Sequence, residues 1–237
     1  MSEQKKKEPG TMEFDRYAMS YDEDLERALS VSGEDKNYFC DGRMKCLGKW
    51  LLKKGITAKS VLDYGCGTGS ATPYVFQHLG AERLVGSDVS AASIEVARAA
   101  HSGEKAVFRL TGEGGEREFD VAFCNGVFHH IVPSMRAAAL NEIRASLRPG
   151  GVFAMFENNP WNPGTRYVMS RCAFDCDAMP LSPPEARRIM RDAGFEVVAS
   201  PRYLFVFPRV LRIFRFLESA LSPLPLGAQY VVMGVKP

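Results

Sequence analysis

The chain has 237 residues, of which 46% are hydrophobic and 24% charged, and its 30 basic residues nearly balance its 28 acidic ones. This length suits a single α/β domain that buries its own core, and the balanced charge lacks the basic excess typical of nucleic-acid-binding proteins. No segment approaches the ~20 consecutive apolar residues of a membrane span, so neither a nucleic-acid partner nor stable membrane insertion is expected.

The N-terminal segment is polar and rich in lysine. We expect residues 1–12 to form a disordered tail, and because it lacks the apolar segment of a secretion signal, we predict a cytoplasmic protein. The chain has six cysteines, none of them in a C-x-x-C pair. They are predicted to be reduced thiols, and no metal site is expected.

Residues 13–55 are predicted to form a helical cap. Leu25, Ala28 and Leu29 share one helix face, and a break follows near Gly33. A second helix has its apolar face at Met44, Leu47, Leu51 and Leu52.

From residue 56, short β-rich runs alternate with helical ones, which is typical of a parallel sheet covered on both faces. A strong turn is predicted at residues 148–151. Near the C-terminus, two strands at 197–208 and 228–235 flank a helix at 209–221. The other strands are predicted at 60–64, 83–87, 106–110, 119–124 and 152–156, and the helices at 71–79, 91–101, 135–147 and 184–193.

A glycine-rich loop follows the first strand, with Gly65, Gly67 and Gly69 at alternate positions. Glycine lets backbone N–H groups approach a ligand closely, and the helix that follows adds free donors. Asp63 precedes the loop, and Asp88 ends the next strand. A carboxylate about 20 residues beyond such a loop meets ribose hydroxyls, so an adenosine-containing ligand is expected.

The loop does not match the other nucleotide-binding patterns. A dinucleotide fingerprint needs glycine or alanine at its sixth position, where Ser70 or Thr72 stands in the two possible registers. A P-loop needs Gly-Lys-Ser or Gly-Lys-Thr, which is absent. A nicotinamide-dependent oxidoreductase is therefore disfavoured.

The segment Asp63-x-Gly-x-Gly-x-Gly69 resembles the first motif of the class I S-adenosylmethionine-dependent methyltransferases, of the small-molecule type. The resemblance implies that the loop passes under the methionine part of the cofactor, that Asp63 holds its amino group and that Asp88 binds its ribose. Because this ligand is a cation, an acid beside the loop is favourable. The cofactor-binding residues implied are Asp63, Gly65, Cys66, Gly67, Gly69, Asp88, Val89, Gly112, Glu113, Asn125 and Gly126.

Residues 119–131 resemble the fourth-strand motif of the same family, in which Asn125 and Gly126 would pass the homocysteine side of the cofactor. His130 is the candidate general base, since an imidazole can take a proton from a hydroxyl or amine. His129 is a candidate substrate contact. Alternatively, one of these histidines packs in the core or caps the next helix.

Polar residues follow the fifth strand at the carboxyl edge of the sheet, where ligands of open α/β folds bind. Glu157, Asn158, Asn159 and Trp161 are expected to line the acceptor pocket, with Glu157 as the second candidate catalytic base. Alternatively, they form a turn satisfied by its own side chains. This segment and residues 225–230 resemble a methyltransferase subgroup.

Two further segments are candidates for covering the site. Tyr17 and Tyr21 share a helix face, and their rings are predicted to contact the sulfonium ion through cation–π attraction or else to pack internally. The helix at 209–221, apolar with three arginines, is expected to cap the acceptor pocket, with Phe205, Phe207, Phe214 and Phe216 making that pocket apolar. Membrane contact and dimerisation are the alternatives.

The family resemblance implies a Rossmann-like α/β fold, with a seven-stranded, mostly parallel sheet, helices on both faces, an antiparallel last strand and a helix inserted before that strand. Residues 13–237 would form one methyltransferase domain, comprising the helical cap 13–55, a cofactor-binding half 56–160 and a substrate-side half 161–237.

The sequence therefore predicts a monomeric or homodimeric enzyme that methylates an oxygen or nitrogen of a small organic acceptor with S-adenosylmethionine, in natural-product or sugar and lipid metabolism. A catalytically silent scaffold or sensor that binds the same cofactor is the alternative.

Overall fold

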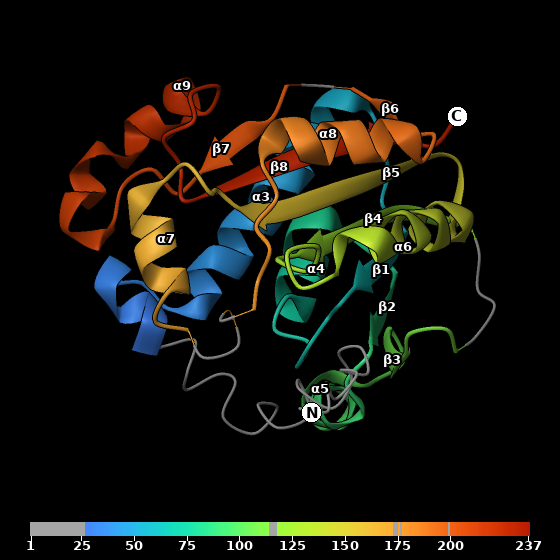
Figure 1. Cartoon of the computed structure of the whole chain (residues 1–237). Coiled ribbons are helices and arrows are strands. Elements are labelled where there is room, and N and C mark those ends of the chain that lie inside the picture. Colours follow the sequence, from blue (N-terminus) through green and yellow to red (C-terminus); the bar gives the residue numbers. More distant parts are fainter. Residues whose placement is uncertain (1–26, 114–117, 173–174, 176, 199) are drawn as a thin grey trace, which may run out of the picture.

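The computed structural model describes residues 27–113, 118–172, 175, 177–198 and 200–237. Its centre is one eight-stranded sheet in the order β3-β2-β1-β4-β5-β8-β6, with β7 also paired to β8 (Figure 1). The strands are β1 (Ser60–Tyr64), β2 (Arg83–Asp88), β3 (Ala106–Leu110), β4 (Phe119–Asn125), β5 (Leu147–Asn158), β6 (Glu196–Val197), β7 (Arg202–Leu204) and β8 (Gln229–Val235).

Helices cover both faces of this sheet (Figure 1). Their α-helical members are α3 (Lys36–Lys54), α4 (Thr72–Leu79), α5 (Ala91–His101), α6 (Pro133–Ser146), α7 (Pro163–Met169), α8 (Pro183–Asp192) and α9 (Glu218–Leu221), and the 3-10 segments are η1 (Ser30–Ser32) and η3 (Arg209–Leu217). Within the described parts of the chain, no helix has the length and apolarity to cross a bilayer.

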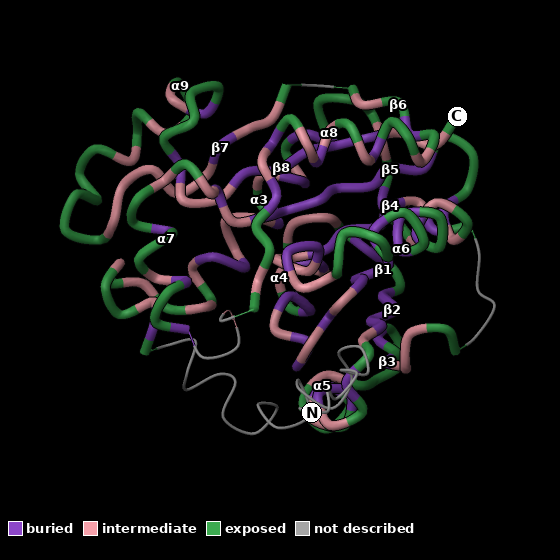
Figure 2. The backbone as a smooth tube through the Cα atoms, in the orientation of Figure 1, coloured by how far each residue is buried: buried purple, intermediate pink, exposed green. Residues whose placement is uncertain are grey.

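The alternation of side chains along each strand builds two cores. Val61 of β1 packs with Leu47 of α3 and Val75 of α4 on one face. Its neighbour Leu62 packs with Leu140 of α6 on the other face. Because successive strand residues point to opposite faces, a central strand buried on both sides is largely apolar. Figure 2 shows the buried residues gathered along the sheet and the inner faces of the helices.

The pairing confirms the predicted Rossmann-like, mostly parallel sheet, but it has eight strands where seven were predicted. Strands β3, β2, β1, β4 and β5 are parallel to their neighbours, and β8 runs antiparallel to β5. The run predicted as one strand at 197–208 is divided into β6 and β7, which both pair with β8. Pro201 stands between them and has no N–H to donate to a ladder.

Most of the predicted elements lie within a few residues of the observed ones, and the differences have local causes. The turn predicted at residues 148–151 belongs to β5, where Gly150 N–H donates to Lys236 and Lys236 N–H donates to Gly151. The helix predicted at 209–221 is mostly the 3-10 segment η3. No sequence pattern predicted α7, which begins at Pro163 with Asn162 as its N-cap.

The break predicted near Gly33 is present, and the start of the predicted cap at residue 13 lies outside the described residues. Gly33 has φ +74° and ends η1, and the Asp35 carboxylate then caps α3 by accepting from Tyr38 N–H at 2.8 Å. In α3, Leu47 is fully buried, whereas Leu52 is 82% exposed. The predicted apolar face was therefore wrong at Leu52, which lies about 100° around the helix from its neighbour Leu51.

We predict that Leu47→Ala lowers the free energy of unfolding by about 2–5 kcal/mol, because it leaves a cavity in a close-packed core. Leu52→Ala, in the same helix, should change it by less than about 0.5 kcal/mol. Urea unfolding followed by circular dichroism compares the two variants. Similar losses for both would contradict the packing described for α3.

Candidate functional site

The loop between β1 and α4 has a backbone that only glycine adopts readily. Gly65, Gly67 and Gly69 have φ of +73°, +52° and +78°, which lies in the left-handed region that disfavours residues with a Cβ. A Cβ on Gly65 would lie 2.4 Å from Val127 Cγ2, whereas a Cβ on Gly67 would have no atom of the described residues within 4 Å apart from its chain neighbours. At Gly67 the loop therefore exposes bare backbone.

That backbone borders a cavity of about 400 Å³ at the carboxyl edge of the parallel strands. Three parts of the chain border the cavity: the glycine loop, the segment after β4 and one side of α3. The segment before η3 closes it from the C-terminal half. The wall includes Asp63, Gly65, Cys66, Gly67, Thr68, Phe39, Arg43, Asn125, Gly126, His129, His130, Asn158, Cys172, Asp175 and residues 205–208.

Three buried side-chain oxygens on this wall lack hydrogen-bond partners among the described residues. Asp175 Oδ1 belongs to the polar cluster described below, and the other two are Oδ1 of Asp63 and Oδ1 of Asn125. Burial, together with the charge of Asp88, raises the pKa of Asp63 to about 8, although Arg43 opposes the shift. Since buried polar atoms are nearly always paired, two unpaired acceptors on one wall indicate a ligand that brings donors.

Asp88 connects the end of β2 to the glycine loop. Its Oδ2 accepts from Gly67 N–H at 2.8 Å, and its Oδ1 accepts from Ser90 N–H at 2.9 Å. The loop is also tied to β2 through Ser87, whose carbonyl accepts from the N–H groups of Gly65 and Cys66. The predicted acid therefore lies beside the predicted loop.

Other predicted contacts lie away from the cavity wall. Val89 is exposed after β2, and Glu113 turns back to accept from Leu110 N–H at 3.2 Å, beside Gly112. A Cβ on Gly69 would meet His101 of α5 at 2.9 Å. Tyr17 and Tyr21 lie outside the described residues.

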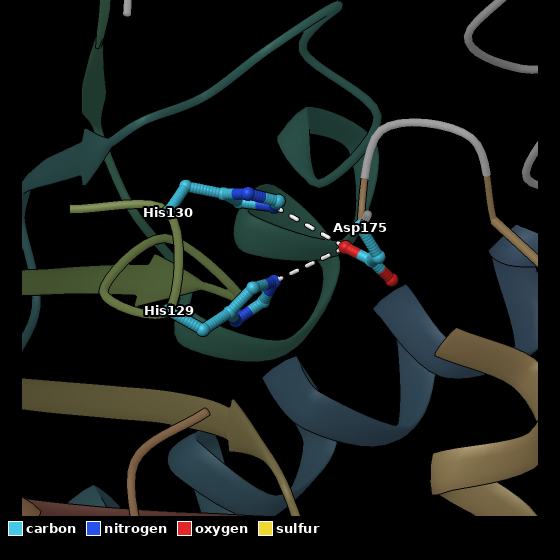
Figure 3. Close-up of side chains that lie close together, drawn as sticks. All are labelled: His129, His130 and Asp175. Atoms are coloured by element: carbon cyan, nitrogen blue, oxygen red, sulfur yellow. Dashed lines mark ion pairs between the residues drawn. The ribbon is translucent and has the colours of Figure 1, made fainter. Parts of the chain in front are cut away.

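A polar cluster lies at the floor of the cavity, and Figure 3 shows three of its residues, His129, His130 and Asp175. Glu157 accepts from Phe128 N–H at 2.7 Å and lies 2.6 Å from His129 Nδ1. On the other side, Asp175 Oδ1 lies 3.5 Å from His129 Nε2 and 3.4 Å from His130 Nε2.

The two imidazoles have opposite electrostatic surroundings. Burial alone would lower the pKa of His129, but the carboxylates of Glu157 and Asp175 outweigh it and raise that pKa to about 9. Burial and the neighbouring His129 lower the pKa of His130 to about 3. At neutral pH, His130 is therefore the uncharged imidazole on the cavity wall.

Three residues predicted to line the acceptor pocket do not reach it. Glu157 is 1% exposed and both of its oxygens are engaged, so it orients His129 instead of meeting a substrate. Asn159 is fully buried, with its amide donating to the carbonyls of Pro225 and Gly227. Trp161 is half exposed to solvent outside the cavity wall. Asn158 does line the cavity.

Of the C-terminal segment 205–221, only its start, residues 205–208, lines the cavity. Phe205 and Phe207 line the cavity, but η3 and α9 do not, so the expectation that this helix caps the pocket was wrong. Instead, η3 borders a separate, open hollow of about 700 Å³ with η1, lined by Arg209, Arg212 and Arg215 among others. That hollow contains none of the motif residues.

Asp175 and Arg43 line the cavity, and no sequence pattern predicted either of them as a site residue. Asp175 stands 45 residues after His130 in a segment without a recognised motif, and only the folded chain brings it to the histidines. Arg43 comes from α3, where its spacing matches an ordinary helix surface position. No local pattern marks either residue as part of a site.

The methyltransferase-domain family model matches residues 62–153, from β1 to β5. A methyltransferase of Synechocystis is 32% identical over 156 residues, which cover 61% of this chain and 70% of that protein. The chain belongs to the class I S-adenosylmethionine-dependent methyltransferases. The family's cofactor is S-adenosylmethionine.

Two other relatives match over a shorter part of their length. N-demethylindolmycin N-methyltransferase of Streptomyces griseus is 27% identical over 48% of this chain, and a methyltransferase homologue of Aspergillus luteorubrus is 28% identical over 57%. The chain spans about half the length of these relatives, 50% and 56% respectively.

Similarity of fold extends over nearly the whole chain. The structure of magnesium protoporphyrin IX methyltransferase from Synechocystis, solved with bound S-adenosylhomocysteine, superposes with a TM-score of 0.61 at 15% identity. The superposition covers 95% of the present chain and 98% of the Synechocystis protein.

We predict that Asn159→Ala lowers the free energy of unfolding by about 1–3 kcal/mol, because it removes a buried amide that donates to the carbonyls of Pro225 and, in a buried bond, Gly227. Asn158→Ala is the matched control, since its Oδ1 accepts only a half-buried bond from Gln229. Its cost should stay below about 1 kcal/mol. Chemical denaturation measures both, and a larger loss for Asn158→Ala would be the contrary result.

Proposed function

We propose that this chain transfers the methyl group of S-adenosylmethionine to an oxygen or nitrogen of a small organic acceptor held in the 400 Å³ cavity. The observation that carries the proposal is the pair of unpartnered oxygens of Asp63 and Asn125 beside the left-handed glycine loop. The cofactor supplies a methyl group already activated by its sulfonium charge. The protein then has to bind, orient and exclude water.

The residues present fit the chemical groups of this cofactor. An ammonium group brings three donors and a positive charge. The donors complement the two unpaired oxygens, and the charge stabilises the carboxylate form of Asp63, whose pKa is raised in the free protein. Asp88 is the residue we assign to the ribose, because a carboxylate accepts from both hydroxyls. Gly67, with open space beside it, lets the ligand approach the backbone closely.

The remaining wall of the cavity favours a largely apolar acceptor with one nucleophilic group. Phe39, Phe205 and Phe207 supply the apolar surface, and His130 and Asn158 supply polar groups. A cavity of this size is typical of small-molecule sites. Similarity to N-demethylindolmycin N-methyltransferase of Streptomyces griseus supports a small organic acceptor.

We assign His130 to the acceptor's nucleophilic atom. With its pKa lowered to about 3, its imidazole is uncharged at neutral pH and accepts a hydrogen bond from a hydroxyl or amine. Such a group orients the acceptor well but takes up a proton weakly. Holding the acceptor in line with the methyl group at roughly 3–3.5 Å is the larger contribution.

The direct test is transfer of an isotopically labelled methyl group to a panel of small hydroxyl and amine compounds, read by mass spectrometry. Asp88→Ala should weaken the binding of S-adenosylhomocysteine at least about tenfold, the loss of one charge-assisted contact. Asp192→Asn, exposed on α8, is the control and should bind like the parent protein. Binding without any transfer would favour a scaffold or sensor, and no binding would refute the proposal.

Binding of the cofactor should also change the protonation state of Asp63. In the free protein at pH 7, Asp63 is mostly protonated, because its pKa is raised to about 8. A cationic ligand beside it favours the carboxylate, so binding should release about one proton at pH 7 and none well above pH 8. Calorimetry in buffers of different ionisation enthalpy measures the number. Asp63→Asn should abolish the release, and an unchanged release in that variant would rule out Asp63 as its source.

A further inference from the structure

His129, His130 and Asp175 each direct one ligand atom to a common point in the floor of the cavity. These three atoms lie within 4.8 Å of one another. Figure 3 shows both imidazole rings turning Nε2 toward the same carboxylate oxygen. Two nitrogens and one oxygen at this spacing are a set that first-row transition metals bind.

The present contacts leave this oxygen incompletely satisfied. The distances from Asp175 Oδ1 to the two Nε2 atoms are 3.5 and 3.4 Å, longer than ordinary hydrogen bonds. Among the described residues this buried atom has no hydrogen-bond partner. A cation between the three atoms would satisfy it.

Glu157 supplies the support that metal-binding histidines usually have. Its Oε2 lies 2.6 Å from His129 Nδ1, so one proton is held on that nitrogen, and Nε2, which faces Asp175, is the nitrogen that becomes a ligand once it loses its own proton. Metal-ligating histidines typically donate their other ring N–H to a carboxylate in this way. Glu157 is itself fixed by Phe128 N–H at 2.7 Å.

The charges of the cluster also match a divalent ion. Asp175 contributes one negative charge directly, and Glu157 contributes a second through His129. Two neutral imidazoles and two carboxylates together balance a charge of +2, which avoids an uncompensated buried charge. Binding displaces a proton from His129 Nε2.

We propose that His129, His130 and Asp175 bind a divalent first-row transition ion, with zinc as the best match, in the floor of the cavity. Three protein ligands leave a coordination position free, as in catalytic zinc sites, and both histidines lie on the cavity wall. The catalytic use of this ion rests on the proposed methyl transfer, whereas its binding does not.

In that use, the ion binds the acceptor's hydroxyl oxygen at the free position. A hydroxyl bound in this way loses its proton to solvent near neutral pH. The oxygen lone pair then forms the new O–C bond, the C–S bond breaks, and its electron pair stays on sulfur, which gives the neutral thioether. The ion thus supplies the activation that an uncharged, weakly basic imidazole lacks.

The test is equilibrium dialysis of the chelator-treated full chain against Zn²⁺, with metal content measured by mass spectrometry. We expect about one equivalent per chain. Asp175→Asn and His130→Gln should each weaken binding at least about tenfold, and Glu157→Gln about 10–100-fold through the orientation of His129. Asp177→Asn, in the same segment, is the matched control and should retain the ion.

The failure of this proposal is distinguishable from failure of the methyltransferase assignment. Asp175→Asn should bind S-adenosylhomocysteine like the parent, which also shows that the variant folds. Equal zinc binding by Asp175→Asn and the parent, or no stoichiometric binding by either, would overturn the metal site. Methyl transfer that is lost with chelator and restored by Zn²⁺ supports the catalytic role, and transfer unaffected by chelation would overturn that role alone.

Discussion

The tie between the glycine loop and the end of β2 is the constraint on which the site depends. The N–H groups of Gly65 and Cys66 donate to the Ser87 carbonyl, and Gly67 donates to the Asp88 carboxylate. These bonds hold a left-handed backbone that few residues besides glycine tolerate. Because β1 and β2 are adjacent parallel strands, their carboxyl ends meet at one edge, and the loop, the acid and the cavity come together there.

A second constraint is the buried charge below the cavity. Glu157, His129 and Asp175 form a line of alternating charge in which the imidazole is cationic at neutral pH. Its presence depresses the basicity of His130. The protein therefore has an uncharged imidazole on the cavity wall next to buried ionised groups. A proton on His129 Nε2 keeps this group an ion pair with Asp175, whereas the proposed metal ion in its place would bind an acceptor.

Local patterns predicted the fold accurately where the physical signal is itself local. Short β-rich runs predicted β1 to β4, and the helix predicted at 91–101 is α5, whose start is capped in the structure by Ser90, which accepts from Ser93 N–H. The prediction was wrong where tertiary pairing decides the structure. Residues 148–151 have turn chemistry but join β5 through bonds to Lys236, and the strand at 197–208 is divided around Pro201.

The sequence by itself predicted the position of the glycine loop, Asp63, Asp88 and the two histidines, because each lies near or after the carboxyl end of a strand, at the edge where ligands of parallel sheets bind. Only the tertiary structure decided which polar side chains face the cavity. Glu157 and Asn159 are turned inward by buried hydrogen bonds, while Asp175 is brought to His129 and His130 from a distant segment. Side-chain direction and long-range proximity depend on how the layers pack, and spacing along the chain does not encode them.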